Sequence, residues 1–393
     1  MIEIFWFMIQ EEMNRIMRAE KERVKGEVGG TVKGVRDDFL FIFPRHFFNN
    51  FRLEFRTKFR KILFLLLLQR DNKHIDRKAF KYTIHNYVYT VINMKLFEVI
   101  NGTLLSDASV CVYRNKYYRY SLTAKSKEFL EWVAKIFSSF GIPTYITLSN
   151  KITNVYSLGF YINARGIDEL MKLREKWYAK INGKTVKIVP KDLELTPTTL
   201  LFWYLGDGSL IRRRDNNINV PTIVLATNGF SKEDVEFLLK KLKELELNFY
   251  IVKNTSLTGF RKEMITNYLL YSSVEDGTPF RFFKLVGLHC PKEIANCVTG
   301  RKGRFRELHF FKDKWPTKED WIKILSNVKE VGPILRKRRL ELGLSQNQLA
   351  RKIGIRRENI RDVELMKRCL SVKNFRKILE ALDLDVEEIL KAI

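Results

Sequence analysis

The chain has 393 residues, enough for two or three domains, and 45% of them are apolar, which allows a substantial core. Lysine and arginine number 71 against 45 acidic residues, so the formal net charge is +26 at pH 7. An excess of this size is not an ordinary solvated surface. Nucleic acid is the commonest partner of such a chain, and an anionic membrane surface is the alternative.

The cysteines form neither a metal-binding nor a disulfide pattern. None of the four belongs to a C-x-x-C pair, so the sequence indicates no zinc ribbon and no disulfide framework. One cluster contains both residue types that bind zinc, but its spacing matches no standard knuckle: His289, Cys290, Cys297 and His309. This cysteine usage fits a reducing compartment.

No stretch of the sequence predicts a membrane segment. The longest apolar run, residues 62–68, is far too short to span a bilayer, and the first residues lack a basic leader and a small-residue cleavage site. We therefore expect a protein without membrane contact, located in the cytoplasm or, if the host is eukaryotic, in an organelle.

Residues 1–93 are a basic N-terminal extension whose structure the sequence does not predict. Its Arg/Phe-rich stretch, residues 51–60, fits a basic arm on DNA. It also fits an extension that merely precedes the first domain, and we favour that second interpretation.

Two stretches of the chain predict the same order of elements. The first comprises a helix (94–106), two strands (109–113 and 117–123), a helix (126–140), two strands (144–149 and 154–162) and a helix (165–180). The second comprises a helix from residue 197, strands (209–213 and 221–227), a helix (231–245), strands (249–254 and 267–273) and a helix (278–287). We interpret residues 94–195 and 196–300 as copies of one αββαββα unit, paired about a pseudo-two-fold axis.

An aspartate ends the first helix of each unit. Residues 200–210 predict a short apolar helix that stops at Asp207, and Asp107 stands at the same place 207 − 107 = 100 residues earlier. A carboxylate there lies at the negative end of the helix dipole and close to apolar surface, so it needs a compensating cation. Gly102, Ser106 and Gly206 are small enough for the two helices to approach closely.

If these helices pack together, Asp107 and Asp207 repel each other unless a divalent cation lies between them. Hard oxygen ligands favour Mg²⁺, and carboxylate-bound metals that activate water and stabilise a leaving oxygen serve phosphodiester hydrolysis. The plain alternative is a pair of helix-end aspartates satisfied by backbone N–H groups.

Given these features, residues 94–300 resemble the LAGLIDADG homing endonucleases in their single-chain form with two motifs. The most specific part of the resemblance is residues 184–209, which lead into the second aspartate turn. The resemblance implies that Asp107 and Asp207 bind the catalytic metal, Mg²⁺ with Mn²⁺ as a substitute. It also implies a monomer that cleaves both strands of double-stranded DNA and leaves short 3′ overhangs. Ala108 and Phe202 depart from the family's glycines without touching either aspartate.

The resemblance further implies that each unit lays a four-stranded sheet on the DNA major groove. The contacting residues would be Arg114, Lys116, Tyr117 and Arg119 in the first unit and Arg212, Arg213, Arg214 and Asn216 in the second. Asn228 falls where a polar residue positions the attacking water. Its equivalent in the first unit would be Ala124, with Lys125 beside it as a substitute. Lys187 and Lys253 are candidates for the basic pocket.

Residues 301–332 form a basic connector, and residues 333–393 resemble the lambda-repressor/Cro-type helix-turn-helix. Ser345 is predicted to cap the second helix, while Gly354 supplies the turn. The residues expected to face DNA are Gln346, Arg357, Glu358, Arg361 and Asp362. The alternative is a small helical interaction module without DNA contact.

The sequence thus predicts an α+β protein with a duplicated αββαββα fold and an all-α helix-turn-helix domain. Its expected function is site-specific DNA cleavage of the homing endonuclease type, with Mg²⁺ and at a long site. One alternative is a transcription regulator with the same domains and no catalysis; the retention of both aspartates argues against it. The other alternative is an RNA maturase, which would bind its host intron RNA.

Overall fold

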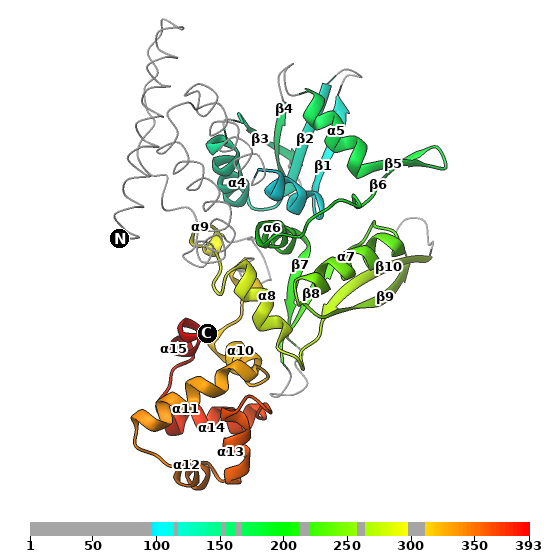
Figure 1. Cartoon of the computed structure of the whole chain (residues 1–393). Coiled ribbons are helices and arrows are strands. Elements are labelled where there is room, and N and C mark those ends of the chain that lie inside the picture. The colour runs from blue at the N-terminus through cyan, green and yellow to red at the C-terminus, as the bar shows by residue number, and fades with distance from the viewer. Residues whose placement is uncertain are drawn as a thin grey trace, which may run out of the picture. The chain divides into compact units, whose positions relative to one another are not determined.

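The computed structural model describes residues 96–113, 117–140, 142–150, 155–161, 167–212, 220–257, 264–297 and 311–393 (Figure 1). The N-terminal extension lies outside these ranges. So do five of the expected DNA-contacting residues: Arg114, Lys116, Arg213, Arg214 and Asn216. The described part contains the two expected units and, after them, a helical C-terminal region.

The two units repeat one architecture. In the first, residues 96–104 are helical. They are followed by β1 (Ala108–Tyr113), β2 (Tyr117–Ala124), α4 (Lys127–Ser139), β3 (Tyr145–Asn150), β4 (Val155–Tyr161) and α5 (Ile167–Trp177). The second unit contains α6 (Pro197–Asp207), β7 (Gly208–Ile211), β8 (Thr222–Ala226), α7 (Lys232–Glu244), β9 (Phe249–Leu257), β10 (Met264–Ser272), α8 (Thr278–Val286) and the short α9 (Lys292–Ala295). The sheets have the orders β1-β2-β4-β3 and β7-β8-β10-β9, so the predicted duplication is confirmed.

Local sequence signals set the starts of the helices. The hydroxyl groups of Ser126 and Ser231 accept hydrogen bonds from backbone N–H groups in the first turns of α4 and α7. Thr196 does the same for α6, whose first position is Pro197. A proline is favourable there because its missing N–H would have no partner in the helix. In the described part of the chain, no helix combines the length and the apolar character that crossing a membrane requires.

The strand register divides each sheet into a helix-covered face and an open face. In the first sheet, Tyr120 pairs with Phe160, and both are fully buried beneath α4. Side chains alternate along a strand, so Arg119 and Tyr117 belong to the opposite, open face. The same alternation in the second sheet places the buried Leu225 on the covered face.

The first helices of the two units, here called the motif helices, pack against each other at short range. A Cβ on Gly102 would lie 2.5 Å from the carbonyl oxygen of Thr199, and one on Gly206 would lie 2.2 Å from the Ser106 hydroxyl. The Thr199 hydroxyl donates to the carbonyl oxygen of Glu98 across this contact, at 3.2 Å. In Figure 1 the second motif helix, α6, is seen between the two sheets. The units are therefore joined through their motif helices.

Two parts of the fold differ from the sequence prediction. The chain after α5 turns into a hairpin of β5 (Tyr178–Ile181) and β6 (Lys184–Lys187), where the helix was expected to extend to residue 180. The described part of the expected connector is folded, with η1 (Lys312–Lys314), α10 (Lys318–Leu325) and η2 (Lys329–Val331). Trp315 and Trp321 are buried within it. Residues 311–331 therefore belong to the core rather than to a linker.

Five helices make up the C-terminal region: α11 (Gly332–Glu341), α12 (Gln346–Ile353), α13 (Arg357–Glu364), α14 (Val372–Leu382) and α15 (Val386–Ala392). Ser345 caps α12, and Gly354 ends it in the left-handed conformation, at φ 75°. Arg339 of α11 and Glu364 of α13 form a buried two-bond ion pair, at 2.5 and 2.9 Å. Such a pair fixes the register of two helices, because separating it would leave buried charges without partners.

The close approach of the motif helices makes Gly102 a sensitive position. Alanine is the better helix former, but its methyl group would meet the backbone of α6 at 2.5 Å, so we expect Gly102→Ala to destabilise the fold. The expected loss is about 1–3 kcal/mol, the usual range for overpacking, measured by urea unfolding. The control is Ser138→Ala on an exposed position of α4, which should change stability little. Equal stability of the two variants would contradict the close contact.

Candidate active site

Asp107 and Asp207 stand where a motif helix gives way to a strand. Asp207 is the last residue of α6, and Asp107 ends the turn that follows helix 96–104. The strands β7 and β1 begin at the next residues. Asp207 is half-buried, while Asp107 is exposed. Within the described ranges, neither carboxylate accepts a hydrogen bond, so backbone N–H groups do not satisfy this pair.

The two carboxylates lie close enough to influence each other. Burial and, next, the negative charge of Asp107 raise the pKa of Asp207 to about 6. Burial also raises the pKa of Asp107. The positive charges of Lys187 and Lys314 oppose both shifts. Two carboxylates and two lysines therefore share one site, in which ionising both carboxylates costs free energy unless a further cation is present.

Lys187, the last residue of β6, reaches the end of the first motif helix. Its Nζ donates to the carbonyl oxygens of Ser106 (3.1 Å) and Ala108 (2.9 Å), the two residues that flank Asp107. Burial lowers the pKa of Lys187 to about 8, although Asp207 and Asp107 act in the other direction. The β5–β6 hairpin is thus the element that delivers this lysine to the site.

Lys314 does the same for the second motif helix. Its Nζ donates to the carbonyl oxygens of Tyr204 (3.2 Å), Leu205 (2.7 Å) and Gly206 (3.1 Å) at the end of α6, where the negative pole of the helix dipole lies. Burial lowers the pKa of Lys314 to about 8, with both aspartates opposing the shift. Lys314 supplies the cation that a helix-end carboxylate needs. Sequence reasoning missed it because no motif marks it within the expected connector.

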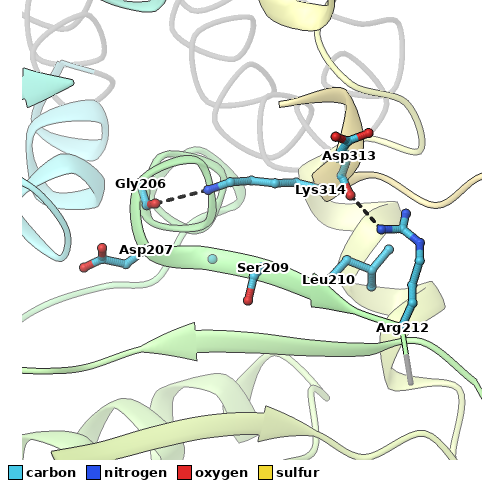
Figure 2. A pocket seen from close by; sticks show the side chains of 8 residues that line it. Gly206, Asp207, Ser209, Leu210, Arg212, Asp313 and Lys314 are labelled. Carbon is cyan, nitrogen blue, oxygen red and sulfur yellow. Dashed lines mark hydrogen bonds between the residues drawn. The ribbon is translucent and has the colours of Figure 1, made fainter. Parts of the chain in front are cut away.

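A pocket opens beside Asp207. It is lined by Gly206, Asp207, Gly208, Ser209, Leu210, Arg212, Asp313 and Lys314. Figure 2 shows the Lys314 amine at the carbonyl oxygen of Gly206 and the Arg212 guanidinium at that of Asp313. A carboxylate next to a lysine in an accessible pocket is suited to hold a divalent cation together with a phosphate group.

Comparison with known proteins agrees with this fold. Residues 97–277 match the LAGLIDADG DNA endonuclease family, and residues 335–389 match a helix-turn-helix family. The chain carries a LAGLIDADG endonuclease-family domain followed by a helix-turn-helix domain.

Relatives of the LAGLIDADG domain occur in very different organisms. The chain is 30% identical over 163 residues to the uncharacterized protein MJ1098 of Methanocaldococcus jannaschii, a match that covers 41% of this chain and 60% of that protein. It is 28% identical over 164 residues to the probable intron-encoded endonuclease 1 of Wickerhamomyces canadensis, covering 39% and 67%. The match to the first of these relatives spans less than two thirds of that protein's length.

Solved structures with similarity to the chain include two LAGLIDADG proteins. The homing endonuclease I-WcaI bound to its DNA recognition sequence gives a TM-score of 0.35 at 22% identity, over 48% of this chain and 79% of that chain. The N-terminal LAGLIDADG domain of DUF199/WhiA gives 0.31 at 14% identity, over 50% and 83%.

In the described part of the chain, three predicted site residues of the LAGLIDADG domain form no hydrogen bond or ion pair with the aspartates, and the charged groups that act on the aspartates do not include them. Lys253 is exposed on β9, and its register with Tyr268 puts it at the helix-covered face of the sheet. Asn228 is exposed in the turn after β8. Leu122 pairs with Ala108 in the first sheet, and Leu225 pairs with Gly208 in the second, so the two leucines are equivalent. At this point the two units are offset by 225 − 122 = 103 residues. The equivalent of Asn228 is therefore Lys125 rather than Ala124. Lys125 is exposed as well.

The open face of the first LAGLIDADG sheet carries the described DNA candidates of that unit. Tyr117 and Arg119 alternate with the buried Tyr120 and with Tyr118, which packs against the core. Tyr117 is 42% exposed.

Arg212, expected on the DNA, is instead hydrogen-bonded to other residues of the protein. Its guanidinium donates to the Asp320 carboxylate (2.8 Å) and to the carbonyl oxygens of Asp313 and Trp315 (both 2.9 Å). The cause is strand alternation: Arg212 follows the buried Leu210 by two positions, so it points to the covered side of the sheet.

The helix-turn-helix candidates divide into two groups. Arg357 and Glu358, in the first turn of α13, are exposed, and Arg361 is exposed next to its ion-pair partner Asp362. Gln346, in contrast, donates its side-chain amide to Glu364 at 2.9 Å. Because this bond adds to the buried Arg339–Glu364 pair, Gln346 serves the packing of the domain rather than projecting freely from it.

The raised pKa of Asp207 predicts a pH-dependent stability. The native state binds this proton more tightly than the unfolded chain, because the pKa moves from 3.8 to about 6 on folding. Ionisation therefore destabilises the native protein above pH 6, and this cost disappears as the pH falls towards 3.8. In EDTA, Asp207→Asn should stabilise the protein at pH 8 by about 1–3 kcal/mol.

The measurement is denaturant unfolding of wild type and variant at pH 8 and pH 5, with Glu175→Gln on the exposed side of α5 as the control. The gain from Asp207→Asn should shrink at pH 5. A variant that is less stable than wild type at pH 8 would show that Asp207 is satisfied in the fold and not strained.

Proposed function

We propose that the protein is a site-specific DNA endonuclease of the homing type, which makes Mg²⁺-dependent double-strand breaks at a long DNA site. The observation that carries this proposal is the charge arrangement at the ends of the motif helices. Asp107 and Asp207 come from equivalent positions of the two units, and Asp107 raises the pKa of Asp207. Lys187 and Lys314 supply the matching positive charges.

The residues present fit a hard divalent cation. Both carboxylates lack hydrogen-bond donors within the described ranges, and their mutual repulsion is relieved when a cation binds. The part of the chain that the structure describes contains no group of three or more His, Cys, Asp or Glu side chains placed to hold a metal. Phosphate oxygens of the DNA and water would therefore complete the coordination. When bound, Mg²⁺ supplies a Lewis acid that stabilises the charge developing on the scissile phosphate.

In the proposed reaction, two aspartates and two lysines of this chain surround the phosphate groups that are attacked. Asp107 and Asp207 would hold the metal, with one carboxylate for each DNA strand. Lys187 and Lys314 hold positive charge beside them, fixed by backbone carbonyl oxygens rather than by mobile loops. Water attacks the phosphorus in line with the departing 3′ oxygen, as phosphodiester hydrolysis with an in-line geometry requires.

DNA binding would combine the open sheet faces with the helix-turn-helix domain. A net charge of +26 provides the sequence-independent attraction to phosphates. Tyr117 and Arg119 belong to the open face of the first sheet, and Arg357 begins the recognition helix α13. Both motif helices belong to one chain, so a monomer supplies both half-sites.

Two other functions remain as outcomes of the test. A regulator built from the same domains would bind its site and leave it intact. An RNA maturase would bind intron RNA and promote its splicing. Incubating the full chain with Mg²⁺ and a duplex library, including the intron-less copy of its host locus, separates them. Absence of any cleaved DNA would favour the regulator.

Each aspartate should be needed for double-strand cleavage. Asp107→Asn or Asp207→Asn removes one metal-binding charge, so we expect double-strand cleavage to fall at least about a hundredfold, with DNA affinity nearly unchanged. The measurements are plasmid linearisation with Mg²⁺ and a gel-shift assay with Ca²⁺. Glu175→Gln is the matched charge control. Unchanged linearisation by either aspartate variant would remove that carboxylate from the proposed site.

The recognition helix provides an independent prediction about specificity. The first residues of such a helix contact base edges in the major groove, so Arg357→Ala should weaken binding by about 1–3 kcal/mol and relax specificity at one base pair. Competition gel shifts against single-base variants of the selected site measure both effects. Arg351→Ala, an exposed residue of the preceding helix α12, is the control. A loss that is identical on all DNA sequences would assign Arg357 to a phosphate contact.

A further inference from the structure

Arg212 bonds to the segment that carries Lys314. This segment, residues 312–321, is here called the strap; it comprises η1 and the beginning of α10. The two carbonyl oxygens that Arg212 binds belong to Asp313 and Trp315, the residues directly before and after Lys314. One planar guanidinium group therefore fixes the backbone on both sides of the lysine. Figure 2 shows one of these two contacts.

A buried carboxylate anchors the same guanidinium. The Asp320 side chain is 6% exposed and accepts the Arg212 Nε–H at 2.8 Å. The same oxygen accepts hydrogen bonds from the backbone N–H and the hydroxyl of Thr317, which caps α10. Charge-assisted bonds of this kind are the stronger ones, and a buried carboxylate that lost its cation would be left uncompensated. Moving the Arg212 guanidinium away from Asp320 would therefore cost free energy, and the ion pair holds it in this position.

The strap has further contacts with the second unit. The Tyr204 hydroxyl donates to the carbonyl oxygen of Lys314 at 2.5 Å, and the Trp315 indole donates to that of Gly287 at 2.9 Å. These bonds hold the strap against α6 and α8 but do not bind the carbonyl groups that flank Lys314. That contact comes from Arg212, which directly follows β7, the strand that begins after Asp207. The lysine and the aspartate are thus tied to one strand.

The first unit positions its lysine in another way. The residue equivalent to Arg212 is Val112, at 212 − 100, which is exposed and carries no charge. There the Arg174 guanidinium and the Tyr178 hydroxyl, from α5 and β5, bind the backbone of Val110 in β1. Loss of Arg212 should therefore disturb the second half of the site and spare the Lys187 half.

We propose that Arg212 is a positioning residue, which clamps the strap so that the Lys314 ammonium group stays on the end of α6 beside Asp207. The inference rests on the proposed function for its consequence in cleavage, but the clamp itself is a property of the free protein. Arg212 acts through Lys314 and does not itself contact the reacting phosphate.

The clamp is tested without DNA by lysine labelling of the full chain. N-hydroxysuccinimide acetate modifies accessible amines, and mass spectrometry reads each site. Lys314, 7% exposed in the clamped protein, should react about tenfold faster in Arg212→Ala, because the bonds that keep the strap closed are lost. Lys187 in the same molecules is the internal reference and should keep its rate. Lys240→Ala on the exposed side of α7 is the charge-matched control.

The variant Arg212→Lys distinguishes loss of the clamp from a general folding defect. A lysine keeps the ion pair with Asp320 but cannot reach both carbonyl groups at once, because it lacks the planar fork of arginine. This variant should fold with wild-type circular dichroism and still show faster labelling of Lys314, by less than Arg212→Ala. Labelling of Lys314 at the wild-type rate in folded Arg212→Lys would overturn the proposal.

The consequence for cleavage is specific to one strand. On a plasmid with the selected site, both Arg212 variants should accumulate nicked circles, because one strand is cut about tenfold more slowly than the other. Equal slowing of both strands would overturn the link between clamp and half-site. If the wild type cuts no DNA, the proposed function fails, while the labelling result still decides whether Arg212 holds Lys314.

Discussion

The structure depends on the meeting of two apolar helices whose negative ends both carry an aspartate. Gly102 and Gly206 bring the motif helices so close that a methyl group at either position would overlap the partner. The same proximity concentrates negative charge, from two helix dipoles and two carboxylates, in one small region. Lys314 compensates this charge by binding the last carbonyl oxygens of α6, and Lys187 does so by binding the carbonyl oxygens of Ser106 and Ala108, which flank Asp107. The close packing of the motif helices and the compensation of their charge by two lysines therefore depend on each other.

This constraint also orients the rest of each unit. Strands β1 and β7 begin at the residues after Asp107 and Asp207, so each sheet starts at the charged centre. Alternation along those strands then decides which side chains face the helices and which face outward. In the proposed function, a DNA duplex lies along the open faces and over the ends of both motif helices. The geometry that stabilises the fold is also the one that would present two phosphates to two carboxylates.

Most of the fold could be predicted because it follows local rules. The duplicated order of helices and strands, the caps at Ser126, Thr196 and Ser231, and the helix-turn-helix were all readable from spacing and residue type. Arg212 is a position where two local signals disagree. The basic run that follows it favours a DNA contact, but period-two alternation from the buried Leu210 directs its side chain to the covered face of the sheet. The sequence predicts that Gln346 faces DNA, and only the folded domain brings its side chain to Glu364.

Lys314 could not be predicted, because a contact across 108 residues leaves no mark in the local sequence. The offset of 100 residues between the units also fails here: Lys187 plus 100 is Gly287, and Lys314 lies 314 − 287 = 27 residues further on. The family match ends at residue 277, so a domain cut at that boundary would keep Asp207 and lose the lysine that compensates it. The second half of the candidate site is therefore completed by the segment that leads into the helix-turn-helix domain.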